Sequence, residues 1–63
     1  MRVTIKHFHT NGDMIWKDLL GKIHREDGPA IIYADGTEHW YYDNKYLKDV
    51  HSVEELIIKL ILE

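Results

Sequence analysis

The stretch Asp35-Gly36-Thr37-Glu38-His39-Trp40 repeats the pattern of Asn11-Gly12-Asp13-Met14-Ile15-Trp16, in which a turn dipeptide is followed after three residues by tryptophan. The two glycines and the two tryptophans are each separated by 24 residues, whereas Lys22 and Lys45 are separated by 23. Asn-Gly and Asp-Gly between alternating apolar residues are strong signals for hairpin turns. A short repeat of this kind predicts two successive β-hairpins.

A two-residue type I′ loop at each dipeptide would fix the strand register. It would place His7 opposite Trp16, and Ile31 opposite Trp40. This register predicts a core face that collects Val3, Ile5, Met14, Trp16, Ile31, Tyr33, Trp40 and Tyr42. The opposite face would hold Phe8, Ile15, Ile32, His39 and Tyr41, which make it too apolar for ordinary solvent exposure.

The rest of the chain predicts further turns and one helix. Gly21 and Asp43-Asn44 should each lead into a short strand, over 22–25 and 45–48, and Asp27-Gly28-Pro29 should form a tight connection in which Gly28 supplies an unusual φ. Ser52-Val53-Glu54-Glu55 is a capping box at a helix start. Apolar residues then follow at helical spacing, namely Val53, Leu56, Ile57, Leu60 and Ile61, with Ile58 and Leu62 widening the stripe.

The predicted fold is therefore α+β: an antiparallel β-meander of two hairpin repeats, about six short strands, followed by one C-terminal α-helix. We expect residues 1–63 to form a single domain, with hairpin repeats over 2–25 and 26–49 and the helix over 52–62. A chain of 63 residues without cysteine has a small core and no disulfide, so association with other chains is expected. The net charge of −3 disfavours a general nucleic-acid binder. Neither a signal peptide nor a membrane span is expected, and the expected location is the cytoplasm.

The segment from Lys22 to Tyr41 contains the phrase His24-Arg25-Glu26-Asp27-Gly28-Pro29-Ala30 followed by Asp35-Gly36, three residues and Trp40. It resembles β-hairpin repeats of the MORN-like or WG-like type in small bacteriophage and bacterial proteins. The resemblance covers about residues 21–48, with 7–21 as a diverged copy, and leaves the helix outside. It implies a β-meander used for binding, with no catalytic residues to transfer. Many proteins with this repeat are short phage accessory proteins, so a host cytoplasm is the implied setting.

Other functional interpretations are less favoured by the sequence. His7 and His9 share a strand face but lack metal-ligand spacing, and His7 should stack on Trp16 instead. His24, Arg25, Glu26 and Asp27 offer acid and base groups, yet a turn in which Arg25 pairs locally is the simpler interpretation. We therefore expect no enzyme activity, no cofactor and no metal. The tryptophans could stack on nucleobases, but their equivalent positions favour packing.

The main hypothesis is a non-enzymatic protein-binding module, a phage-type accessory protein that docks on and modulates a host or defence protein in the manner of an anti-CRISPR. One alternative is a structural homo-oligomer or scaffold repeat without a foreign target, and another is a weak binder of single-stranded nucleic acid. The residues predicted to contact a partner are Phe8, Ile15, His39, Tyr41, Ile58 and Leu62, because aromatic and apolar groups outside the core are typical of protein interfaces.

Overall fold

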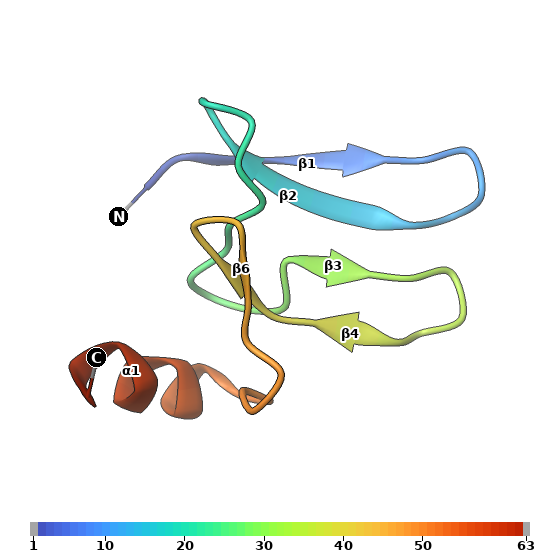
Figure 1. The fold of residues 1–63 in the computed structure, drawn as a ribbon. Coiled ribbons are helices and arrows are strands. Elements are labelled where there is room, and N and C mark those ends of the chain that lie inside the picture. The colour runs from blue at the N-terminus through green and yellow to red at the C-terminus, as the bar shows by residue number, and fades with distance from the viewer. Residues whose placement is uncertain (1, 63) are drawn as a thin grey trace.

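The computed structural model describes residues 2–62 and contains antiparallel strands in two sheets and one C-terminal helix (Figure 1). The larger sheet has the order β1-β2-β3-β4, and the smaller one pairs β5 with β6. Their bounds are β1 Thr4–Phe8, β2 Met14–Asp18, β3 Ile31–Ile32, β4 Glu38–His39, β5 Tyr41–Tyr42, β6 Lys45–Tyr46 and α1 Val53–Leu62. The predicted α+β meander with a C-terminal helix is confirmed, although 22–25 forms only an isolated bridge, between Lys17 and Ile23.

Both predicted hairpin registers were wrong by one residue. His7 pairs with Ile15 rather than Trp16, and Ile31 pairs with His39 rather than Trp40. Each loop has three residues, 10–12 and 34–36, and its last residue is a glycine with positive φ, 98° at Gly12 and 91° at Gly36. This is a type I turn closed by a glycine bulge, which adds one residue to the predicted two-residue loop.

The side chain of the residue before each glycine explains this choice of loop. Asn11 Oδ1 accepts the Asp13 N–H at 3.1 Å, and Asp35 Oδ1 accepts the Thr37 N–H at 2.9 Å. Such a bond to the backbone two residues on stabilises the turn, and neither Asn11 nor Asp35 has the positive φ that a type I′ loop would need.

The shifted registers change the predicted faces. Trp16 lies opposite Lys6 and shares its face with Met14 and Ile32. Ile31 and Ile15 instead lie together on the other face, with His7 and His39. Val3 and Ile5, predicted in the core, are 62% and 50% exposed. A one-residue change in loop length therefore exchanges the partners across every strand pair.

The type I′ turn occurs elsewhere in the chain. Asp43 and Asn44 have φ values of 54° and 70°, and they form the two-residue loop between β5 and β6. The corresponding turn of the first repeat, 19–21, has three residues and ends at Gly21 with φ 85°. The second repeat is therefore one residue shorter at this turn, which accounts for the spacing of 23 rather than 24 between Lys22 and Lys45.

The two repeats are joined side by side by backbone and side-chain hydrogen bonds. The Trp16 N–H donates to the Ala30 carbonyl at 2.8 Å, and Asp13 Oδ1 accepts the Ala34 N–H at 2.8 Å. At the other end of the hairpins, Asn44 Oδ1 accepts the Ile23 N–H at 2.8 Å. These bonds tie each turn of one repeat to the chain of the other.

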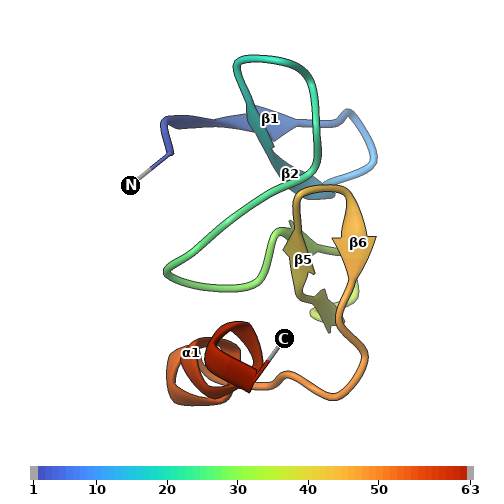
Figure 2. The ribbon, with the colours of Figure 1, turned by 60° about the vertical axis from the view of Figure 1, so that its left-hand side comes forward.

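The apolar core lies between the second repeat and α1. Its cluster consists of Trp40, Leu47, Val50 and Leu56, with Tyr42 and Val53 packed against it. Ala30 and Ile31 are also buried, as predicted for Ile31. Ser52 caps the helix, since its Oγ accepts the Glu55 N–H at 3.1 Å, as the capping box predicts. Figure 2 shows the β5–β6 hairpin between the first hairpin and α1. Within residues 2–62 no helix is long and apolar enough to cross a membrane.

Candidate protein-binding surface

The six residues predicted to contact a partner lie in three separate places. Ile58 and Leu62 are on α1, and Ile15, His39 and Tyr41 lie on or beside the sheet face that carries Ile31. Phe8 lies on the opposite face, because it pairs with Met14 and not with Ile15. The expectation that Phe8 and Ile15 share one surface was therefore wrong, and the cause is the additional loop residue.

The helix exposes most of its apolar side chains. Leu56 is 2% exposed, whereas Ile57, Ile58, Ile61 and Leu62 are 51%, 56%, 74% and 80% exposed. We call these four residues the exposed helix face. Ile57 and Ile61 belong to the apolar stripe read from the helical spacing, and such a stripe is usually buried. Here α1 contacts the core through its first turns and extends away from the sheet beyond them (Figure 1).

A groove runs along one side of the exposed helix face. Its volume is about 320 Å³, and its lining is Asp49, Val50, Glu55, Ile58, Lys59 and Leu62. Two predicted contact residues, Ile58 and Leu62, thus share one concave surface with a polar border. An apolar centre with a charged rim is the usual anatomy of a protein interface.

His39 and Tyr41 belong to an aromatic cluster. The His39 ring contacts Tyr33 and Tyr46 with ring centroids 5.0 and 4.8 Å apart, and Tyr41 lies 5.4 Å from Tyr46. His39 and Tyr41 are partly buried by these contacts, as is Ile15 by its strand neighbours. This surface is largely occupied by its own packing and offers less free apolar area than α1.

Phe8 is the aromatic residue that projects furthest into solvent, at 72% exposed. The amine of Lys6 lies over its ring, 5.1 Å from the centroid, and also over Trp16 at 5.4 Å. The cation therefore covers part of this face, and Phe8 stands apart from the other predicted contact residues.

The phrase from His24 to Ala30 builds a clamp around Trp16. The Arg25 guanidinium stacks on the Trp16 ring at 4.0 Å, donates through Nε to Asp27 Oδ1 at 2.9 Å and through Nη1 to the Pro29 carbonyl at 3.1 Å. A Cβ on Gly28 would approach Arg25 Cζ to 2.8 Å. A side chain at position 28 would therefore have to displace the Arg25 guanidinium from its place on Trp16, and Gly28 does not have the unusual φ that we predicted.

His24 is completely buried, and its contacts are those of a residue that supports the fold. It occupies the position that Leu47 has in the second repeat, since the N–H groups of both residues donate to the carbonyl of the equivalent tryptophan, at 3.1 and 2.8 Å. Its Nδ1 accepts the Asp43 N–H at 3.0 Å, and its ring packs on Tyr42 at 4.4 Å. Nε2 lies 3.3 Å from Glu26 Oε2 but does not form a hydrogen bond with it.

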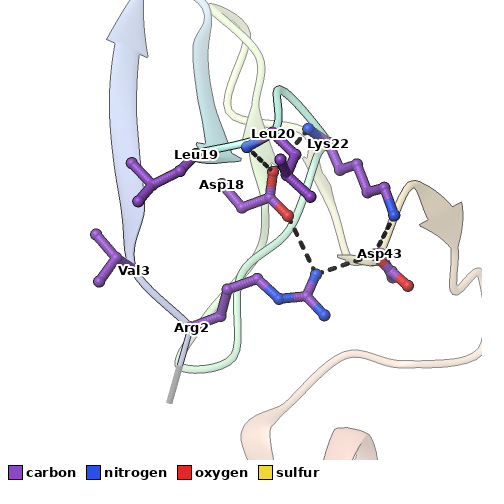
Figure 3. A pocket seen from close by; sticks show the side chains of 7 residues that line it. All are labelled: Arg2, Val3, Asp18, Leu19, Leu20, Lys22 and Asp43. Atoms are coloured by element: carbon purple, nitrogen blue, oxygen red, sulfur yellow. Dashed lines mark hydrogen bonds and ion pairs between the residues drawn. The ribbon is translucent and has the colours of Figure 1, made fainter.

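Side-chain charges of Arg2, Asp18, Lys22 and Asp43 meet in one place (Figure 3). Arg2 Nη1 also lies 3.3 Å from His24 Nδ1. Arg2 Nη1 lies 3.2 Å from Asp18 Oδ2 and 2.9 Å from Asp43 Oδ1, and Lys22 Nζ lies 3.4 Å from the same Asp43 oxygen. Burial disfavours the charged form of Asp18, but the Lys22 and Leu20 N–H groups lower the pKa of its carboxyl below 3.8. The hydrogen bond from Arg2 likewise lowers the pKa of Asp43.

These charges are paired with one another, and with Val3, Leu19 and Leu20 they line a pocket of about 300 Å³. In the part of the chain that the structure describes, no three side chains of histidine, cysteine, aspartate or glutamate converge on a possible metal position. His7 and His9 are exposed, and His7 does not stack on Trp16, contrary to expectation.

The exposed helix face combines four exposed apolar side chains of one element with a groove, whereas Val3, Leu19 and Leu20, which are similarly exposed, come from two separate segments. Sequence periodicity located Ile58 and Leu62, but it could not show that Ile57 and Ile61 would remain exposed beside them. Comparison with protein-family models, with curated proteins and with solved structures finds no match to this chain.

Proposed function

We propose that this protein is a non-enzymatic protein-binding module that contacts its partner through the exposed helix face. The observation that carries the proposal is the exposure of Ile57, Ile58, Ile61 and Leu62 on a helix of ten residues, only one of which is buried. A contiguous apolar patch on a small protein marks an interaction site, since leaving it in water costs free energy and promotes aggregation. An amphipathic helix that presents residues at i, i+1, i+4 and i+5 fits an apolar groove on a second protein.

The proposed partner class rests on the resemblance of the segment from His24 to Ala30 to the β-hairpin repeats of small bacteriophage and bacterial proteins. This resemblance supports the proposal that the chain is a phage-type accessory protein, which acts in the host cytoplasm on a host or defence protein. The burial of Trp40 and the stacking of Arg25 on Trp16 argue against nucleobase stacking as the main activity.

The test compares the wild type with the double variant Ile58→Lys/Leu62→Lys. As a matched control, Thr10→Lys/Thr37→Lys adds the same charge at two exposed positions, one in the 10–12 loop and one directly after the 34–36 loop. Each protein is immobilised and exposed to lysate of its native host, and a retained partner is identified and its affinity then measured with purified protein. We expect one stoichiometric partner that binds the wild type and the control, and at least about a tenfold loss of affinity for the helix variant.

A partner that binds the helix variant as tightly as the wild type would contradict the assignment of the surface. Circular dichroism of the variant must match that of the wild type, because Ile58 and Leu62 are exposed and should not be needed for folding. If sedimentation shows that the helix face instead joins two copies of this chain, the structural homo-oligomer is the better description.

A further inference from the structure

Within residues 2–62, no strand pairs with the outer edge of β1. β1 begins the larger sheet and pairs there with β2 on one side only (Figure 1). It has five residues, whereas β4, at the other end of the sheet, has two. A long unpaired edge presents a row of backbone donors and acceptors that another strand can use.

Strand register identifies the backbone groups that face outward. The His9 N–H donates to the Asp13 carbonyl, so odd-numbered residues of β1 form the bonds to β2. Since bonding alternates along an antiparallel pair, Thr4, Lys6 and Phe8 direct their N–H and carbonyl groups away from β2. The same alternation is seen on β2: Trp16, which lies opposite Lys6, donates its N–H to the Ala30 carbonyl and therefore away from β1.

Exposed apolar side chains gather at the start of this edge. Val3 and Ile5 are 62% and 50% exposed. Val3 lines the same pocket as Leu19 and Leu20, which are 72% and 82% exposed (Figure 3). The edge therefore offers two features that strand addition uses. Its backbone groups can form hydrogen bonds with another strand, and its exposed apolar side chains can be buried by that strand.

We infer that β1 pairs with β1 of a second copy in antiparallel orientation, with Ile5 opposite Ile5 on the two-fold axis. A register centred on Lys6 would place two ammonium groups directly opposite, which is unfavourable. The register centred on Ile5 pairs the two isoleucines at a non-hydrogen-bonded position and sets Thr4 opposite Lys6 of the second copy. The outward groups of Thr4 and Lys6 then form about four inter-chain hydrogen bonds.

Two contacts limit the size of this interface. The Arg2 N–H donates to Glu26 Oε1 at 3.3 Å, so continuous pairing covers residues 3–7. The Lys6 amine lies over Phe8 and Trp16, on the face opposite to Ile5, and does not obstruct the axis. An interface of one short strand per copy is small and implies a weak, concentration-dependent dimer. It uses a surface other than the exposed helix face, so it does not rest on the proposed function.

Cysteine cross-linking tests the register directly, because the chain has no cysteine of its own. In the proposed dimer the two copies of an Ile5→Cys variant have Cα atoms about 4.5–5.5 Å apart, within disulfide range. The two copies of Lys6→Cys lie beyond about 7 Å and serve as the matched neighbour. Under mild oxidation at high protein concentration, we expect disulfide dimers from Ile5→Cys at least about tenfold faster than from Lys6→Cys or Ile58→Cys.

Sedimentation equilibrium supplies the second measurement. Ile5→Lys places two like charges on the axis and should raise the dimer dissociation constant at least about tenfold. If Ile5→Lys fails to fold, Thr4→Pro serves instead, since it removes an outward N–H without removing a β1–β2 bond. A wild type that remains monomeric at millimolar concentration, or faster cross-linking at Lys6→Cys or Ile58→Cys, would overturn the inference.

Discussion

The two tryptophans occupy equivalent positions in the repeat but should differ sharply in their contribution to stability. Trp40 is 6% exposed and packs with Leu47, Val50 and Leu56. Removing a buried aromatic side chain of this kind costs about 3–5 kcal/mol. A chain of this length is expected to have a free energy of unfolding of about 3–9 kcal/mol. Trp40→Ala should therefore leave the protein largely unfolded or close to its melting point at 25 °C.

Trp16→Ala is the matched control, because it removes the same atoms from the equivalent site of the first repeat. Trp16 is partly exposed and is held mainly by the stacked Arg25, so the expected cost is about 1–2 kcal/mol. This corresponds to a decrease in Tm of about 5–15 °C. The assay is thermal and urea unfolding followed by far-UV circular dichroism.

Fluorescence provides an independent check, since each variant retains one tryptophan. The Trp16→Ala protein, which emits from Trp40 alone, should have its emission maximum at shorter wavelength and resist quenching more than the wild type, whose emission also includes the partly exposed Trp16. If Trp40→Ala melts cooperatively within a few degrees of the wild type, or if Trp16→Ala is the more destabilised protein, Trp40 is not the core residue described above.

Two further predictions concern the packed polar groups. Gly28→Ala should displace the Arg25 guanidinium from Trp16 and lower the free energy of unfolding by about 1–2 kcal/mol. In an Arg25→Ala background this loss should largely disappear. Equal losses in both backgrounds would argue against the clamp. Because the pKa values of Asp18 and Asp43 are lowered in the folded state, their contribution to stability is complete above their ordinary value of 3.8 and is lost as pH falls through the folded values. Tm should therefore decrease on acidification below about pH 4. The Asp18→Asn variant should have a lower Tm than the wild type at neutral pH, and its Tm should decrease less on acidification. A pH profile of Tm that is unchanged in this variant would contradict the stabilising role of the Asp18 carboxylate.

The sequence predicted the order and type of the elements well, because the turn dipeptides, the repeated tryptophan and the capping box are local signals. The capping of α1 by Ser52 followed directly from such a signal. Lys22 and Lys45 are 23 residues apart, whereas the glycines and the tryptophans are 24 apart. This difference indicated that one turn is a residue shorter, but it could not show which turn. That required the φ values of Asp43 and Asn44.

The register and the surface could not be derived in the same way. Asn11-Gly12 suits both a two-residue and a three-residue loop, and the choice depends on where the Asn11 side chain finds a hydrogen bond. Likewise, the spacing of Ile57 and Ile61 is that of a buried stripe. Their exposure depends on how far α1 overlaps the sheet, which is a property of the whole fold.

The asymmetric position of the core has a consequence for local unfolding. The buried apolar cluster of Trp40, Leu47, Val50 and Leu56 and the buried Ala30 and Ile31 all belong to the second repeat and the segment after it, whereas the fully buried side chain of the first repeat, His24, is polar. Amide hydrogens of β1 and β2 should therefore exchange with solvent through partial opening, at a lower free energy than those around Trp40 and Leu47. Opening would begin with the separation of the N-terminal hairpin from β3, a transition in which the second repeat and α1 stay folded together.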